Sequence, residues 1–368
     1  MTGCIVGWAH SKFGKLEGQD VEALIVEAST NAMADAGVGP EDIDAIYLGS
    51  FNNGFADQDF PSSLVLQADE RFRFKPATRV ENACATGSAA IHQGLNFLEA
   101  KQGEIVLVVG VEKMTDTPGP DIGGILMKAS YLKEDSEIEG GFAGVFGQIA
   151  QQYYQKYGDQ SDALAKIAAK NHKNGVGNPW AQLRKDLGYE FCREISDKNP
   201  IVAGPLKRTD CSLVSDGAAA VVLTDMETAL TMKKAVIFRS RSHVNDYLPM
   251  GRRDMSQLEG CAKAWANALS DGKLTLDDLS MVETHDCFTM AELMEYEAMG
   301  LTKPGKGAQA LEEGWTEKDG KLPVNPSGGL KSKGHPIGAT GVSMHVLAAM
   351  QLRGEAGDMQ VDGTNLVG

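Results

Sequence analysis

One cysteine, Cys84, lies among small residues in the segment NACATGSAA, just before a stretch with helical spacing of its apolar residues. A sulfur at the start of a helix is close to unpaired backbone N–H groups and to the positive end of the helix dipole. Both favour the thiolate and lower the pKa of the thiol. The pattern predicts a nucleophile, and a small packed structural cysteine is the alternative interpretation.

A base for such a nucleophile is offered by the glycine-rich segment NPSGGLKSKGHPIGATG, residues 325–341, in which His335 stands between Gly334 and Pro336. Glycines permit left-handed backbone and close approach of a ligand, and a histidine titrates near neutral pH. The segment contains neither of the glycine patterns that bind nucleotide phosphates. We therefore interpret His335 as a candidate general base.

A third group of ionisable residues, His285, Asp286 and Cys287, occurs in THDCFTMAE directly after a strand-like run. Open α/β sheets bind ligands at the carboxyl ends of their strands. A metal site would need more ligands at defined spacing, so no metal is predicted. A buried turn is the alternative interpretation of this segment.

Composition limits the partners. The chain of 368 residues has a net charge of −15 and a pI of about 5.0, without a basic stripe, which argues against nucleic acid. Lys207 and Arg208 are either a solvated pair or a clamp for an anionic ligand.

No apolar run approaches the roughly 18 residues of a membrane span. Six dispersed cysteines without a CxxC pair are typical of a reducing compartment, so a cytoplasmic location is expected.

The elements that must position these residues are partly duplicated. The segment starting at Val21 can be placed on the segment starting at Gln257, with Asn31 on Asn267 and Asp42 on Asp278, a constant offset of 236. Each copy predicts an amphipathic helix, a short acidic turn and an apolar strand.

A second echo follows: 85–87 and 339–341 both read Ala-Thr-Gly, and each leads into a helical pattern. Cys84 and His335 would then open equivalent helices of a duplicated α/β unit and can meet across its pseudo-twofold axis. Nucleophilic catalysis needs a base beside its nucleophile in this way.

The middle of the chain has no counterpart in the later half and is predicted to be an inserted loop-and-helix domain. The run DGAAAVVLTD, 216–225, has the pattern of a buried strand and would return the chain to the first unit. Alternating strands and helices favour an α/β fold. The expected domains are an N-terminal half (1–114), the insertion (115–207), a return to that half (208–232) and a C-terminal half (233–368).

Taken together, NACATGSAA, KNHKNGVGNPWAQLR, PLKRTDCSLVSDGAAAVVL, HDCF and NPSGGLKSKGHPIGATG resemble the thiolase family nearly end to end, most closely its sterol-carrier-protein type. The resemblance implies two pseudo-symmetric α/β halves in a five-layered α-β-α-β-α arrangement. It also implies that the inserted loop domain covers coenzyme A.

The resemblance implies roles for four residues. Cys84 matches the nucleophile that takes the acyl group as a thioester, and His335 matches the residue that activates it and helps to hold the thioester oxygen. Cys287 matches the acid/base that moves the α-carbon proton, and His285 replaces the asparagine that most thiolases place near an oxyanion hole.

For binding, the resemblance places Ser212 against the pantetheine arm, and Phe146 with Gly147 beside the acyl pocket. Coenzyme A thioesters would be substrates, no cofactor is implied, and a homodimer or dimer of dimers is expected. The chain ends at TNLVG, 364–368, which reads as the start of a strand. Since family members continue through a glycine turn and a final strand, we expect a tail beyond Gly368.

Two other classes of function fit less well. A decarboxylating ketoacyl synthase, a hydroxymethylglutaryl-CoA synthase or an aldolase would keep the fold, but a decarboxylating enzyme has no need of Cys287, and thiolase-like aldolases lack the nucleophile. A non-catalytic acyl-CoA or lipid-binding subunit would not need two cysteines together with His335.

Overall fold

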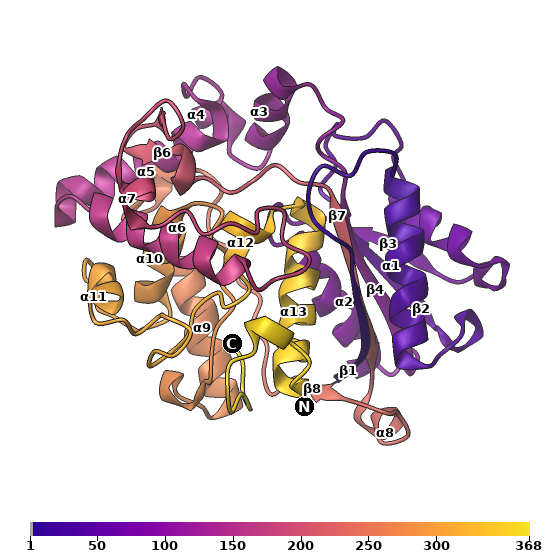
Figure 1. Ribbon diagram of the computed structural model, residues 1–368. Coiled ribbons are helices and arrows are strands. Elements are labelled where there is room, and N and C mark those ends of the chain that lie inside the picture. Colours follow the sequence, from indigo (N-terminus) through magenta and orange to yellow (C-terminus); the bar gives the residue numbers. More distant parts are fainter. Residues whose placement is uncertain (1–2) are drawn as a thin grey trace. The chain divides into compact units, whose positions relative to one another are not determined.

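The computed structural model describes residues 3–368, which form two compact units (Figure 1). Each unit is assembled from three separate stretches of the chain. Unit 1 takes the residues up to Thr117 together with Val214–Arg239 and His335–Ala356, and unit 2 takes Pro118–Leu213, Ser240–Gly334 and Gly357–Gly368.

Unit 1 contains a mixed six-stranded sheet in the order β3-β2-β4-β7-β1-β8. Strands β2 and β3 run parallel, as do β2 and β4, whereas β7 is antiparallel to both β4 and β1. The central strands β4 and β7 are buried along their whole length, which explains their nearly continuous apolar sequences. The strands are β1 (Cys4–His10), β2 (Ala45–Gly49), β3 (Ala77–Val80), β4 (Ile105–Glu112), β7 (Gly217–Thr224) and β8 (Val236–Ile237).

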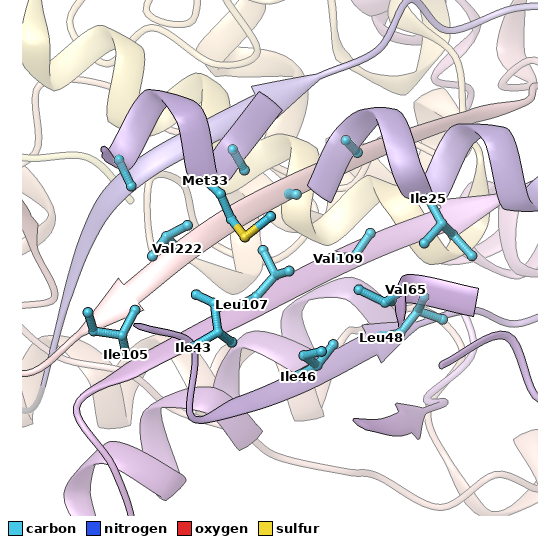
Figure 2. Packing of buried hydrophobic residues seen from close by; sticks show 14 of the residues in the cluster. Ile25, Met33, Ile43, Ile46, Leu48, Val65, Ile105, Leu107, Val109 and Val222 are labelled. Atoms are coloured by element: carbon cyan, nitrogen blue, oxygen red, sulfur yellow. The ribbon is translucent and has the colours of Figure 1, made fainter. Parts of the chain in front are cut away.

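Helix α1 (Val21–Ala36) covers one face of this sheet, where Ile25 and Met33 pack with Leu107 and Val222 (Figure 2). Helices α2 (Thr86–Glu99) and α13 (Ile337–Arg353) pack with the alternate residues of the same strands. Because successive side chains of a strand point to opposite faces, the sheet is covered on both sides and unit 1 is a three-layered α/β structure.

Helices α2 and α13 approach each other at the glycines of the two Ala-Thr-Gly echoes. A Cβ atom on Gly87 would lie 2.7 Å from the backbone nitrogen of Val342, and one on Gly341 would lie 2.2 Å from the backbone nitrogen of Ser88. Neither position has room for a side chain. The echo in the sequence therefore marks a close helix–helix contact.

The first repeat is visible in its hydrogen bonds. The turn after α1, η1 (Pro40–Asp42), is closed by the N–H of Gly39 donating to Asp42 (2.8 Å). In the second copy, α9 (Glu259–Gly272) leads to η6 (Leu276–Asp278), where the N–H of Thr275 donates to Asp278 (2.7 Å).

The strand of the second copy is shorter than its sequence suggests. Within residues 3–368 the run after η6 makes isolated parallel bridges, Met281 with Val367 and Val282 with Val324, where the first copy has the full strand β2. The C-terminal TNLVG segment thus does pair as an extended chain, at Val367.

Unit 2 is mainly helical. Its core joins α5 (Gly141–Tyr157), α6 (Ser161–Gly175) and α10 (Thr289–Ala298), with the short antiparallel hairpin of β5 (Ile201–Ala203) and β6 (Leu206–Lys207) beside α5. None of the helices within residues 3–368 combines the length and apolarity of a membrane span. The short helices of unit 2 are α3 (Gly119–Met127), α4 (Leu132–Asp135), α7 (Tyr189–Arg193), α11 (Gly307–Glu312) and α12 (Gly329–Lys333); α8 (Met226–Ala229) belongs to unit 1.

Candidate active site

The loop before α2 fixes Cys84 in unit 1. Ala83 has left-handed backbone (φ 46°), which turns the chain sharply between β3 and the helix. The hydroxyl of Thr86 donates to the carbonyl of Ala83 (2.6 Å) and accepts from the N–H of Asn82 (2.8 Å). Since α2 begins at Thr86, Cys84 lies two residues before the helix, as the sequence predicted.

The expected low pKa of this thiol is wrong. Cys84 is largely enclosed by protein, and burial, followed by the charges of Glu112 and Glu81, raises its pKa to about 12. These effects oppose the helix N-terminus and favour the neutral thiol. Cys84 is therefore a neutral thiol at neutral pH in the free protein, and a thiol in this state can act as a nucleophile only if a base takes its proton.

His335, the predicted base, lies within reach of Cys84. The Sγ atom of Cys84 and a ring nitrogen of His335 lie within 4.8 Å of each other. The backbone N–H of His335 donates to the hydroxyl of Ser215 (3.0 Å), which holds the main chain of the Gly-His-Pro segment. Helix α13 begins at Ile337, so His335, like Cys84, lies two residues before a helix.

Thr340 determines which nitrogen of His335 can accept a proton. Its hydroxyl donates to the carbonyl of Pro336 (3.0 Å) and lies 2.7 Å from Nδ1 of His335. Because the single hydroxyl proton is used by Pro336, the oxygen accepts from Nδ1–H. In the neutral ring Nε2 then carries the lone pair, which is the tautomer that a general base requires.

A buried carboxylate supports the same loop. Glu112, at the end of β4, accepts hydrogen bonds of 2.9 Å from the backbone N–H groups of Phe51, Asn52 and Gly338. It thereby ties the first turn of α13 to the sheet. Burial raises the pKa of Glu112 to about 7. Glu112 was not among the residues predicted from the sequence, although an acid that ends a buried strand is a recognisable signal.

In unit 2, the His-Asp-Cys-Phe segment ends directly before α10, so Cys287 lies two residues before this helix. Cys287 is 5% exposed, and its carbonyl accepts from the N–H of Ser212 (2.9 Å). Ser212 and Cys287, both predicted site residues, therefore lie side by side. Cys84, Cys287 and His335 each lie two residues before the helix that follows them.

Asp286 supports this segment rather than offering a reactive group. Its carboxylate accepts from the backbone N–H groups of Leu330 (2.6 Å) and Lys331 (3.1 Å) at the start of α12, and from the amide of Asn171 (2.8 Å). A Cβ atom on Gly329 would lie 2.3 Å from this carboxylate. Asp286 thus connects the His-Asp-Cys-Phe segment to the glycine-rich segment at the start of α12.

His285 is neutral at neutral pH. Burial, and then the charge of Lys333, lowers the pKa of His285 to about 4. The Lys333 side chain is fully buried, burial lowers its pKa, and its Nζ has no hydrogen-bond partner within residues 3–368. A neutral imidazole can donate an N–H to an oxygen without carrying a charge itself.

The remaining predicted binding residues differ in their surroundings. Phe146, on α5, stacks on Phe288 with ring centroids 4.3 Å apart. Gly147 packs on the backbone of Ala203, 3.0 Å from where its Cβ would be, so it has a packing role. Lys207 is buried in an ion pair with Asp210 (2.9 Å) and is not a solvated residue, whereas Arg208 is exposed.

Family models match both parts of the chain. The thiolase N-terminal domain matches residues 4–190, and the thiolase C-terminal domain-like model matches residues 242–367. An acetyl-CoA acetyltransferase of Methanothermobacter thermautotrophicus is 37% identical over 98% of this chain and 94% of that protein. Sterol carrier protein 2 of Bos taurus is 31% identical over 98% of this chain and 68% of that protein.

Solved structures agree in fold. The Ltp2-ChsH2(DUF35) aldolase superposes with a TM-score of 0.81 at 20% identity, covering 100% of this chain and 93% of that one. The human mitochondrial 3-ketoacyl-CoA thiolase in complex with CoA gives 0.75 at 18% identity, covering 97% and 93%. With both family models matched and relatives similar over almost the whole length, the chain belongs to the thiolase family.

Proposed function

We propose that this thiolase, an acyltransferase, moves an acyl group between an acyl-CoA or 3-ketoacyl-CoA and CoA or acetyl-CoA through a thioester on Cys84. The observation that supports this most directly is the pairing of Cys84 with His335 in unit 1, within 4.8 Å, with the imidazole tautomer set by Thr340. The similarity to an acetyl-CoA acetyltransferase supports acetyl-CoA as one substrate.

In the first half-reaction, Sγ of Cys84 attacks the thioester carbonyl of the substrate as Nε2 of His335 takes the thiol proton. The carbon–sulfur bond to CoA breaks, the CoA sulfur receives the proton, and the acyl group remains on Cys84. Proton transfer concerted with attack removes the need for a resting thiolate, which the raised pKa of Cys84 disfavours.

In the second half-reaction, the sulfur of Cys287 removes a proton from the α-carbon of acetyl-CoA, and the resulting carbanion attacks the acyl group on Cys84. A carbon–carbon bond forms, the bond between the acyl carbon and the Cys84 sulfur breaks, and the sulfur leaves as a thiolate. The proton that Cys287 took up passes to this sulfur, so that Cys84 is again a thiol. Because the negative charge develops on a thioester oxygen, neutral N–H donors such as His285 lower the barrier. Thiolytic cleavage uses the same groups in reverse.

Binding is proposed to involve Ser212 at the pantetheine arm and Phe146 at the acyl group, with exposed Arg208 rather than the ion-paired Lys207 available for an anion of coenzyme A. No metal or prosthetic group is needed for these steps. The six free cysteines fit a reducing compartment, for which we propose the cytoplasm, and a homodimer or dimer of dimers remains the expected assembly.

The nucleophile can be tested by acylation. Incubation with acetyl-CoA followed by digestion and mass spectrometry should find an acetyl group on the peptide that contains Cys84, and Cys84→Ala should abolish it. Labelling at another residue, or none in the wild type, would reject the assignment.

The acid/base role of Cys287 can be separated from acylation. Cys287→Ala should still form the acetyl adduct on Cys84 but should no longer exchange the α-protons of acetyl-CoA with deuterated solvent. Cys211→Ala, which removes a neighbouring thiol, serves as the matched control and should keep exchange. Exchange retained in Cys287→Ala would exclude this role.

A further inference from the structure

Unit 2 contains an apolar cavity of about 170 Å³ on the side of α5 that carries Phe146. An apolar protein cavity of about 150 Å³ holds a benzene molecule. The cavity here therefore has room for several carbon atoms, well beyond the methyl group of an acetyl unit. Its walls come from α5, from the turn after α3 and from the segment at 248–258.

The cavity borders the proposed acid/base residue through aromatic rings. Phe142 and Phe146 line it, and both pack on Phe288, with ring centroids at 6.3 Å and 4.3 Å. Phe288 directly follows Cys287. In a 3-ketoacyl-CoA, the chain to be transferred starts two bonds from the carbon that Cys287 would protonate. The cavity on the other side of these rings is thus in a position to hold the end of the acyl chain that is farthest from the thioester.

One wall of the cavity is cationic. Arg253 lines it, and its Nε is buried without a hydrogen-bond acceptor within residues 3–368. A buried donor that lacks an acceptor is costly, and an anion supplied by a ligand would remove that cost.

The neighbouring acid does not neutralise this arginine. Asp254 is bound to the Nζ of Lys156 (2.9 Å), to the hydroxyl of Ser256 (2.6 Å) and to the amide of Gln257 (2.9 Å). These bonds lower the pKa of Asp254 and satisfy its carboxylate. The cavity therefore combines apolar walls with an arginine that forms no ion pair within residues 3–368 and whose buried Nε lacks an acceptor.

We propose that this cavity binds acyl groups that have an apolar body and a terminal carboxylate, with Arg253 holding that carboxylate. The inference rests on the proposed function, because it names the substrate class of the same enzyme. It assigns Arg253 as a specificity-determining residue.

The test compares two substrates that differ only in the end group. 3-Oxoadipyl-CoA carries a terminal carboxylate, and 6-methyl-3-oxoheptanoyl-CoA carries an isopropyl group of similar shape in its place; the homologues one carbon longer form a second pair. The quantity measured is kcat/KM for CoA-dependent cleavage, with acetoacetyl-CoA assayed alongside. The wild type should prefer the carboxylate of at least one pair by about tenfold or more, the range of a charge-assisted hydrogen bond.

Arg253→Gln should lower this preference by about tenfold. Arg252→Gln is the matched control, because Arg252 is exposed and stacks on Tyr247 at 3.6 Å, away from the lining of the cavity. The preference should be unchanged in this control.

The outcomes separate the two proposals. Cleavage of acetoacetyl-CoA without preference for the carboxylate, or with a preference that Arg253→Gln leaves intact, overturns the inference and leaves the proposed function standing. An equal loss on every substrate in Arg253→Gln also overturns it, because Arg253 would then serve an anion of coenzyme A. If no 3-ketoacyl-CoA is cleaved and Cys84 is not acylated, the proposed function itself fails.

Discussion

The starts of α2 and α13 contain the same Ala-Thr-Gly sequence but use the threonine in different ways. In α2, Thr86 is the first helical residue, and its hydroxyl fixes the loop that carries Cys84. In α13, the helix begins three residues before Thr340, so the threonine lies one turn inside and its hydroxyl orients the ring of His335. Because the start of the helix is shifted by one turn, the same threonine fixes the backbone of the preceding loop in one copy and the protonation of a histidine ring in the other.

The two copies also differ at the position of the proposed nucleophile. Residue 338 follows residue 84 by the same 254 positions that separate Ala339 from Ala85, so Gly338 is the counterpart of Cys84. A Cβ atom on Gly338 would lie 2.4 Å from the carbonyl oxygen of Val111. The second copy has no room for a side chain there, and its reactive group lies three residues earlier, at His335. Duplication supplied the scaffold, while packing decided where each reactive side chain could be placed.

The largest expected effect comes from removing the base. His335→Asn keeps a side-chain donor beside Thr340 but cannot accept a proton from Cys84. We expect kcat to fall by about 10²- to 10⁴-fold, the usual contribution of general base catalysis. Steady-state cleavage of acetoacetyl-CoA measures this. A loss of less than threefold would show that His335 is not the base.

The close contact between α2 and α13 should make the stability of the protein sensitive to any side chain added at the contact. In Gly341→Ala the new methyl group meets the backbone of α2, so we expect the free energy of unfolding to fall by about 3 kcal/mol, at the upper end of overpacking effects. Gly87→Ala, with a wider gap, should cost less.

Urea denaturation provides the measurement for both variants. Gly124→Ala, on exposed α3 with open space around it, is the control and should be neutral or slightly stabilising. Equal, small effects at 87 and 341 would contradict the close crossing.

Substitutions of the two threonines should affect different properties: kcat for Thr340 and the free energy of unfolding for Thr86. Thr340→Val removes the acceptor for Nδ1–H of His335, so we expect kcat to fall about tenfold, the order of one lost buried hydrogen bond. Thr340→Ser, which keeps the hydroxyl, should restore most of the activity.

Thr86→Val should instead lower the free energy of unfolding by about 1–2 kcal/mol, since it breaks two hydrogen bonds of the Cys84 loop. Kinetics and denaturation measured on all three variants test the comparison. If Thr340→Val changes stability alone, the tautomer role is wrong.

The smallest effect concerns pH. Since burial and two carboxylates raise the pKa of Cys84 to about 12, its thiolate fraction should still be rising at pH 10. The rate of alkylation of Cys84 by iodoacetamide, followed by mass spectrometry of its peptide, should therefore increase steadily from pH 7 to pH 10. A plateau below pH 8 would show that the start of α2 lowers the pKa after all.

Much of the scaffold was predictable from residue types. The apolar runs of β4 and β7, the acidic turns that end in Asp42 and Asp278, and the helix starts after residues 84 and 335 follow from local pattern, because periodicity and capping are properties of neighbouring residues. The resemblance carried by the Gly-His-Pro and His-Asp-Cys-Phe segments identified the family, and the family models confirmed it.

The supporting residues were not predictable in the same way. Glu112 and Asp286 act through partners that are far away in the sequence, Gly338 for Glu112 and Leu330 for Asp286. Thr340 contacts His335, five residues away, but the helix start at Ile337 is what places its hydroxyl beside the ring. Lys207, expected to be either part of a solvated pair or part of a clamp for an anion, is instead buried in an ion pair with Asp210. The predicted domain boundaries remain a prediction, while the packing assigns α13 to the sheet of unit 1 and most of the later chain to unit 2.

The sequence by itself determined the duplicated helices, the small residues that let them approach, and the identity of the reactive side chains, since these depend on residue type and spacing. The tertiary structure decided the protonation of those side chains. Burial, together with the charges of Glu112 and Glu81, makes Cys84 a neutral thiol, and the hydroxyl of Thr340, which donates to Pro336, leaves Nε2 of His335 as the nitrogen that can accept a proton. A pKa and a tautomer depend on every charge and donor in the surroundings, and those surroundings exist only once the chain has folded.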